Sequence, residues 1–406
     1  MTKMTRRQLL WGGAMALAAS AVPWWKLAVA QEGARRRNLI VLFVAGGWDT
    51  TAGIDPKAAL RTIDSAPGDI KFFGDLSVVT GADRPAVEDF FSAYGSITSL
   101  VRGVQVRSIA HEECTRRIFT GTNSDANPDM GIIAGVELGA DLAVPYMVLG
   151  DSAFSGPFGG SMGRAGTTGQ LVTLLNNRRA YPAPGNVTAR FSPDEAEAAM
   201  IHDYLKARAQ EDLKERAAHG LNKRQLEDFV TSIDRSERLR PLVSRFGEQT
   251  FQQDFQPQID LAVRLLSEGI SNAIQIQHPG NWDTHNDNHV QQIALHQDLF
   301  AGLRSLADQL DAANLLEDTT VAVISEMSRT PKLNGSAGKD HWPVTSAMVF
   351  GGPVQGGRVI GATDDFFQSD PGDGPPITSA SLVSGVLNTL NVDAKAYFPQ
   401  TEALDL

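Results

Sequence analysis

Uninterrupted apolar runs recur along the chain, and several consist mainly of β-branched residues. Runs of this kind, without alternation of polar and apolar positions, are typical of strands that are buried on both faces of a sheet. They predict strands at residues 38–44, 104–110, 144–150, 273–276, 319–325 and 348–350. Helical patterns predict helices at residues 85–100, from His111 onwards, and at 255–269, 286–316 and 379–390. The alternation favours an open α/β sheet with helices between its strands.

The pattern changes between residues 192 and 245, where acidic and basic residues alternate in helical stretches. Ser192, Pro193 and Glu195 match a capping box with proline at the first helical position. The simplest interpretation is a solvated pair of helices that is inserted into, or laid over, the α/β core. A lid or a surface for a partner is the alternative.

The first 30 residues have the pattern of an export signal. Thr5–Leu10 includes paired arginines, Leu9–Val22 is a short apolar run rich in glycine and alanine, and Ala28–Ala30 forms a small-x-small cleavage site before Gln31. The run is short for a spanning helix, which needs about 20 apolar residues. We therefore expect export through the twin-arginine pathway and a periplasmic mature protein without a stable membrane span. An uncleaved membrane anchor is the alternative.

Composition excludes several classes of function. The chain has 406 residues, 42% of them hydrophobic and 20% charged, and its formal net charge is −11. The predicted leader is basic, so the mature protein is more acidic still, which argues against nucleic acid or an anionic membrane surface as the main partner. Cys114 is the single cysteine, so neither an internal disulfide nor a Cys-x-x-Cys site is available. A redox enzyme is disfavoured because no dinucleotide fingerprint is present either.

Carboxylates and imidazoles gather after two of the predicted strands. They are Asp283 and His285, which follow the strand at 273–276, and Glu326, Asp340 and His341, which follow the strand at 319–325. In open α/β sheets, ligands bind just beyond the carboxyl ends of strands, where loops converge. This donor set suits one or two divalent ions, zinc in the first place and manganese or calcium as alternatives.

Other residues have two interpretations. Asp49 follows the first strand after a glycine pair, and could be a further metal ligand or a cap for a turn. His289 lies one helical turn beyond His285, and could be a ligand or a partner behind the ligands. His296 has apolar neighbours along its helix, so we expect a structural role.

His111 begins a predicted helix, and Arg116 and Arg117 follow one turn later. A helix start offers free backbone N–H groups and the positive end of the helix dipole, which together favour an anion. We expect His111 and Arg116 to face a phosphate, sulfate or carboxylate. The alternative is an ordinary cap or a satisfied polar residue.

Several motifs in one order resemble the secreted family known as domain of unknown function 1501, which is assigned to the alkaline phosphatase-like superfamily. They are the twin-arginine leader, Gly46–Asp49, Gly280–His285, Leu316–Asp318, Ser325–Pro331 and Gly338–Trp342. The resemblance covers nearly the whole mature chain. It implies a three-layer α/β/α sandwich with a mostly parallel central sheet, residues 31–406 forming one domain that carries the helical insertion at about 192–245.

The superfamily places Asp and His ligands for two divalent metals at strand ends. The resemblance therefore implies that Asp49 joins the five acidic and imidazole residues in the metal site. In sulfatase-like relatives a Cys or Ser nucleophile precedes a Thr-Gly pair by nine residues. Counting back from Thr120 and Gly121 gives His111 at that position. Attack by a metal-activated water would then replace attack by a side chain, and His111 could instead be a ligand or a phospho-acceptor.

Two functions follow from these patterns. The first is an exported metal-dependent hydrolase of a phosphate, sulfate or related ester, with a small anionic ester as its substrate. The second is a non-catalytic periplasmic scaffold that keeps the fold and binds a cell-envelope protein.

Overall fold

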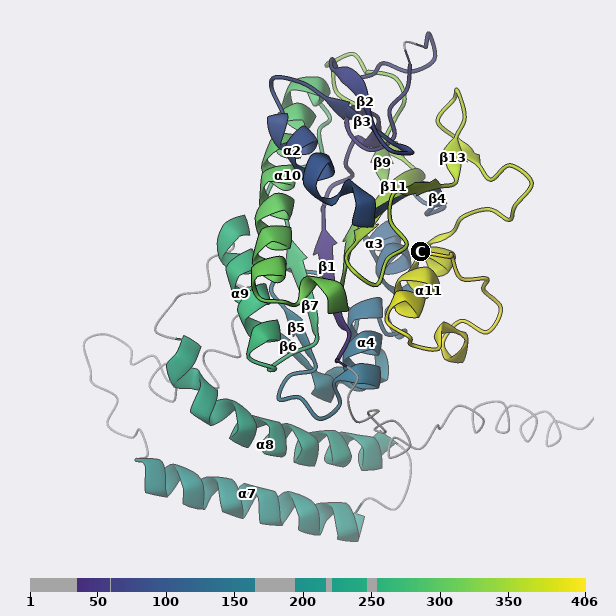
Figure 1. Ribbon diagram of the computed structural model, residues 1–406. Coiled ribbons are helices and arrows are strands. Elements are labelled where there is room, and N and C mark those ends of the chain that lie inside the picture. The colour runs from purple at the N-terminus through teal and green to yellow at the C-terminus, as the bar shows by residue number, and fades with distance from the viewer. Residues whose placement is uncertain (1–34, 59, 165–193, 217–220, 247–253) are drawn as a thin grey trace, which may run out of the picture.

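The computed structural model describes residues 35–58, 60–164, 194–216, 221–246 and 254–406 (Figure 1). The predicted leader, residues 1–30, lies outside these ranges, so the twin-arginine signal stays a prediction. No helix within the described ranges is long and apolar enough to cross a membrane.

An eight-stranded sheet forms the centre of the protein, in the order β12-β4-β11-β8-β1-β7-β5-β6. Its strands are β12 Arg358–Ile360, β4 Thr98–Gln105, β11 Val344–Phe350, β8 Thr319–Ile324, β1 Asn38–Phe43, β7 Ala273–Gln277, β5 Tyr146–Val148 and β6 Met162–Arg164. All neighbouring strands are parallel except β11, which runs antiparallel to both β4 and β8. The sheet is therefore mostly parallel, as the continuous apolar runs predict.

The alternation of side chains along β1 builds two apolar faces. Ile40 and Leu42 belong to one buried cluster, and Leu39 and Val41 to another. The first cluster is completed by α2 Pro85–Tyr94, α9 Phe255–Ser267 and α10 Asn288–Ala312, and the second by α3 His111–Thr120, α4 Met130–Leu138 and α11 Ser379–Thr389. Burial of each large aliphatic side chain contributes about 1.5–3 kcal/mol. The predicted three-layer α/β/α fold is confirmed.

Several predicted boundaries are wrong: β11 begins at Val344 rather than at residue 348, and the largest errors concern β4. The helix predicted at 85–100 ends at Tyr94, and the strand predicted at 104–110 instead spans Thr98–Gln105. Polar residues at the start of β4 are buried by neighbouring strands, which an apolar run in the sequence cannot reveal. Residues 106–110 form a loop, with a left-handed backbone at Arg107 (φ 58°), that leads into α3.

The helical insertion consists of α7 (Glu195–Arg216) and α8 (Leu221–Phe246). Arg238 of α8 donates a hydrogen bond to the carbonyl of Asp141, and Arg235 donates one to the carbonyl of Gly160. Asp141 and Gly160 precede β5 and β6, so α8 contacts the amino-terminal edge of the sheet. Figure 1 shows both helices at the end of the molecule from which β1 starts. A lid over the carboxyl edge does not fit this position.

Short paired strands complete the structure. They are β9 Ser328–Arg329 with β10 His341–Trp342, β2 Asp69–Phe73 with β3 Leu76–Thr80, and β13 Ala362–Thr363 with β14 Ser369–Asp370. The β9–β10 pair connects β8 to β11 at the carboxyl edge. This connection positions much of the candidate site.

Candidate metal centre

Segments from four neighbouring strands converge at the carboxyl edge of the sheet. β7, β1 and β8 are adjacent and parallel, so the loops that follow them leave the sheet at the same end. β11 runs in the opposite direction, so the segment that precedes it lies at this end too. These segments carry Asp283 and His285 after β7, Glu326 after β8, and Asp340 and His341 before β11. The sequence prediction that these strand ends come together is met by the topology.

Asp283, His285 and His341 bring three donor atoms into a triangle. Oδ1 of Asp283 is 3.1 Å from Nε2 of His285 and 3.1 Å from Nε2 of His341. The two Nε2 atoms are themselves 3.1 Å apart. All three side chains are partly exposed, so the triangle is accessible from solvent.

Hydrogen bonds to the far nitrogens fix the orientation of both imidazoles. Nδ1 of His341 is 2.7 Å from the carbonyl oxygen of Ile109, which can only accept, so Nδ1 carries the proton. Nδ1 of His285 is 2.9 Å from Oδ1 of Asp340. The hydrogen bond with His285 lowers the pKa of Asp340 and so keeps it an acceptor. In the neutral rings, both Nε2 atoms are therefore left as lone pairs that face Asp283.

This arrangement fits a metal ion. Lone pairs on a carboxylate oxygen and two imidazole nitrogens repel one another at 3.1 Å unless a proton or a cation lies among them. Zinc is held at about 2.0–2.1 Å by nitrogen and oxygen ligands in a tetrahedron, which places neighbouring ligand atoms about 3.3 Å apart. The triangle therefore has the dimensions of one face of such a site, and the oxygen acceptors behind the imidazoles are the partners that ligating histidines use.

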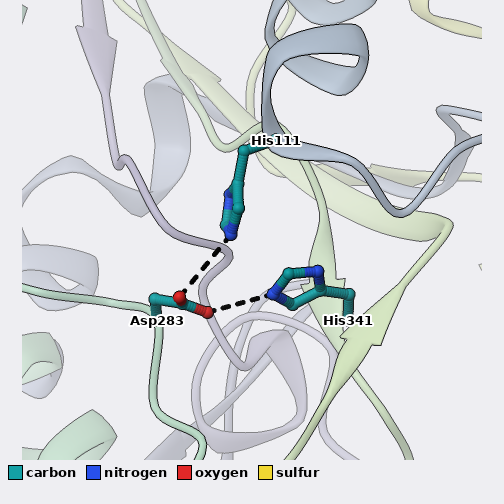
Figure 2. Close-up of side chains that lie close together, drawn as sticks. All are labelled: His111, Asp283 and His341. Carbon is teal, nitrogen blue, oxygen red and sulfur yellow. Dashed lines mark hydrogen bonds and ion pairs between the residues drawn. The ribbon is translucent and has the colours of Figure 1, made fainter.

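His111 packs against both Asp283 and His341, and its ring meets that of His341 edge to face with 4.4 Å between the ring centroids. Its Nε2 is 3.6 Å from Oδ2 of Asp283, and donor atoms of His111, Asp283 and His341 all lie within 4.8 Å of one another. Figure 2 shows the carboxylate of Asp283 pointing toward both imidazoles, with one dashed line to each. Nδ1 of His111 is 2.8 Å from Oε1 of Glu326, and this hydrogen bond raises the pKa of His111 although burial opposes it.

Glu326 is buried behind His111 and does not join the triangle. Its Oε1 also accepts the backbone N–H of Gly46 at 2.7 Å, and Ser325 donates its hydroxyl to Oε2 at 3.2 Å. The structure therefore places Glu326 as a partner of His111. Asp340 has the same relation to His285.

Arg329 is a site residue that the sequence analysis misses. Its guanidinium is fully buried and donates to Oδ1 of Asp283 at 2.6 Å, to the carbonyl of Gly47 at 2.8 Å and to the carbonyl of Lys339 at 3.3 Å. Burial alone would raise the pKa of Asp283, but Arg329 outweighs it and lowers the pKa. Arg329 lies in the Ser325–Pro331 motif, three residues after Glu326, and this position is the signal that could have revealed it.

Asp49 is not brought into the cluster. It caps the short 3₁₀ helix Thr50–Ala52, where its Oδ1 accepts from the backbone and hydroxyl of Thr51. Its Oδ2 accepts from Asn288 at 2.8 Å and pairs with Nζ of Lys339 at 2.8 Å. Lys339 is the second residue that the sequence analysis misses.

Arg116 and His289 also lie apart from the triangle. Nε of Arg116 donates to the side chain of Asn123 at 3.4 Å, and Nε2 of His289 is 3.1 Å from the carbonyl oxygen of Asp64. His296 is fully buried in the core, with Nδ1 2.7 Å from the carbonyl oxygen of Gln292, as its apolar neighbours predict.

A family model described as "Protein of unknown function (DUF1501)" matches residues 36–406. The chain belongs to this family. All the residues of the triangle lie within the DUF1501 match, as do Arg329 and Lys339. No curated protein matches the chain.

Solved structures that are similar to this DUF1501 chain include proteins of the alkaline phosphatase and sulfatase group. A protein in the alkaline phosphatase superfamily from Vibrio parahaemolyticus is 10% identical over 89% of this chain and 68% of its own, with a TM-score of 0.37. A sulfatase from Pseudoalteromonas sp. is 10% identical over 96% and 74%, with a TM-score of 0.36. The lipoteichoic acid synthase of Listeria monocytogenes is 10% identical over 90% and 75%, with a TM-score of 0.38. Likeness at this level carries no argument about activity.

Proposed function

We propose that this DUF1501 protein is an exported metal-dependent hydrolase of a phosphate, sulfate or related ester. The observation that supports it is the triangle of donor atoms from Asp283, His285 and His341, with 3.1 Å between each pair. An ion held there supplies Lewis-acid chemistry toward an anionic oxygen and lowers the pKa of bound water. Two nitrogens and an oxygen favour zinc, with manganese or calcium as alternatives.

The residues around the triangle have separate roles in this proposal. His285 and His341 are held in a ligating orientation by Asp340 and Ile109. His111 is partly exposed beside Asp283, where it would meet the anionic group of the substrate. Its bond to Glu326 favours the cationic imidazole that an anion would require.

One observation favours a second candidate function. The helix start that carries a hydroxyl or thiol nucleophile in sulfatase-like relatives carries His111 here. A periplasmic scaffold that binds a cell-envelope protein would need no nucleophile. Export through the twin-arginine pathway belongs to both proposals, and rests on the leader pattern alone.

Metal content is the first test of the hydrolase proposal. Purification without chelator followed by mass spectrometry should give bound zinc, manganese or calcium, and Asp283→Ala/His341→Ala should lose it. The matched control is His289→Ala/Asp373→Ala, which also removes one imidazole and one carboxylate but leaves the triangle intact. Equal metal content in all three proteins would remove the site from the proposal.

Activity is tested next with chromogenic phosphate and sulfate esters. The wild-type protein loaded with metal should turn over at least one of them, and the Asp283→Ala/His341→Ala protein none. Bound metal together with a stoichiometric envelope protein and no turnover would favour the scaffold.

A further inference from the structure

Asp49 and Lys339 form an ion pair in the core of the protein. Both side chains have 0% exposure, and Nζ of Lys339 is 2.8 Å from Oδ2 of Asp49. Charged pairs are rarely buried to this extent, because both ions lose their hydration. The pair therefore calls for an explanation beyond stability.

The remaining hydrogen bonds of Asp49 are all satisfied by the protein. Thr51 donates twice to Oδ1, at 3.1 Å from its backbone and 2.6 Å from its hydroxyl, and Asn288 donates to Oδ2 at 2.8 Å. The pKa of Asp49 is lowered: burial would raise it, but Lys339 and these donors outweigh burial. The carboxylate is thus an anion with one buried cation beside it.

Asp49 and Lys339 both lie in segments that position the candidate metal centre. Asp49 follows β1, whose parallel neighbours β7 and β8 lead to Asp283 and Glu326. Lys339 precedes Asp340 and His341, and its backbone N–H donates to the carbonyl of Thr284 at 3.1 Å. A carboxylate at this edge would attract a second divalent cation if no other charge met it.

We propose that the ammonium group of Lys339 takes the place of a second metal ion beside Asp49, so that the centre binds one metal ion. Removing the Lys339 side chain then opens a second divalent-cation site. This site would use the carboxylate of Asp49 and the hydroxyl of Thr51, a hard oxygen set that suits manganese, magnesium or calcium. The count of one native ion rests on the proposed function, whereas the role of Lys339 beside Asp49 does not. The prediction that Asp49 is a metal ligand would then hold only in a Lys339 variant.

The experiment compares two truncations of Lys339 that differ in the space they leave. Lys339→Ala removes the charge and leaves room for an ion with its water. Lys339→Met removes the charge but fills nearly the same volume. The probe is Mn²⁺ alone, measured by equilibrium dialysis and by thermal melting with EDTA or with excess Mn²⁺.

Lys339→Ala should bind one Mn²⁺ equivalent more than the wild type, and its melting temperature should rise by about 5 °C between EDTA and Mn²⁺ beyond any rise in the wild type. Lys339→Met and Asp49→Asn/Lys339→Ala should gain neither. The same stoichiometry in Lys339→Ala as in the wild type would overturn the proposal. The proposal would also be overturned if the wild type bound a Mn²⁺ equivalent that a folded Asp49→Asn variant lost.

Folding of the variants is checked with a neutral pair. Asp49→Asn/Lys339→Met should be more stable than Lys339→Met, because it leaves no unpaired buried charge. If Lys339→Ala does not fold without Mn²⁺, refolding that depends on both Mn²⁺ and Asp49 supports the proposal. Failure to refold with Mn²⁺, while the neutral pair folds, opposes it. The two proposals can fail separately. If the wild type binds no metal but Lys339→Ala binds one Mn²⁺ equivalent, the proposed function is contradicted and the role of Lys339 is supported.

Discussion

Arg329 donates a hydrogen bond of 2.6 Å to Oδ1 of Asp283, the oxygen that also faces both imidazoles of the triangle. The guanidinium has 0% exposure, whereas Asp283 is open to solvent on one side. A fixed cation therefore holds the central carboxylate from behind and leaves its other lone pair toward the site.

Replacing Arg329 should weaken the fold and the centre together. In Arg329→Met, Asp283 loses its partner and the carbonyls of Gly47 and Lys339 lose their donors, so we expect the free energy of unfolding to fall by about 2 kcal/mol. Arg329→Lys keeps the charge and one bond and should lose less. Urea unfolding of both variants measures this, and equal stability of Arg329→Met and wild type would contradict it.

A methyl group at Gly338 should disturb the metal ligand opposite it. A Cβ built at Gly338 would lie 1.9 Å from the carbonyl carbon and oxygen of His285, so Gly338→Ala must displace that segment. We expect at least about a tenfold loss of metal affinity, because ligand positions matter within about 0.5 Å. Competition with a chelating dye gives the affinity. Gly335→Ala in the same loop is the control, since no atom lies within 4 Å of its Cβ, and it should bind metal as the wild type does.

Metal removal should lower the thermal stability of the wild type. A ligand at about 100 times its Kd stabilises the folded state by about 2.7 kcal/mol. EDTA should therefore lower Tm by several degrees, and added zinc should restore it. The Tm of Asp283→Ala should respond to neither, and an identical response in the two proteins would place the metal elsewhere.

His296 should make the fold sensitive to acid. Its complete burial lowers the pKa to about 4, below the ordinary value of 6.5, so the ring is neutral in the folded state. Stability from this neutral ring is fully present above pH 6.5 and is lost as pH falls from 6.5 to about 4, by roughly 3 kcal/mol. Urea unfolding at pH 7.5 and pH 4 should show a larger loss for wild type than for His296→Gln. Parallel losses would show that His296 is not the group involved.

Much of the fold and part of the site follow from the sequence alone. Apolar runs mark buried strands, and acidic and imidazole residues after those strands must meet at one edge when the strands are parallel. That reasoning leads to Asp283, His285 and His341. It cannot settle Asp49, because the ammonium that meets it comes from a distant loop, and the residue pattern does not encode that contact.

The role of basic residues is the main thing missed. Nothing in their residue type distinguishes Arg329 and Lys339 from other basic residues in the sequence, and charged residues are most often exposed. Only the packed structure shows that both are buried beside carboxylates. The sequence also cannot show which side chains contact one another. Glu326 and Asp340 therefore resemble ligands in the sequence, whereas in the structure they contact His111 and His285.

The late position of His341 in the sequence has a consequence for the order in which the site is assembled. β10 (His341–Trp342) directly precedes β11, which starts at the edge where β7 and β8 end. His341 is therefore synthesised only after all the parallel strands of the sheet except β12. A nascent chain that has emerged as far as Asp283 and His285 holds two donors of the triangle and lacks the third. If a metal binds here, it is captured by a nearly finished chain rather than by an early folding fragment.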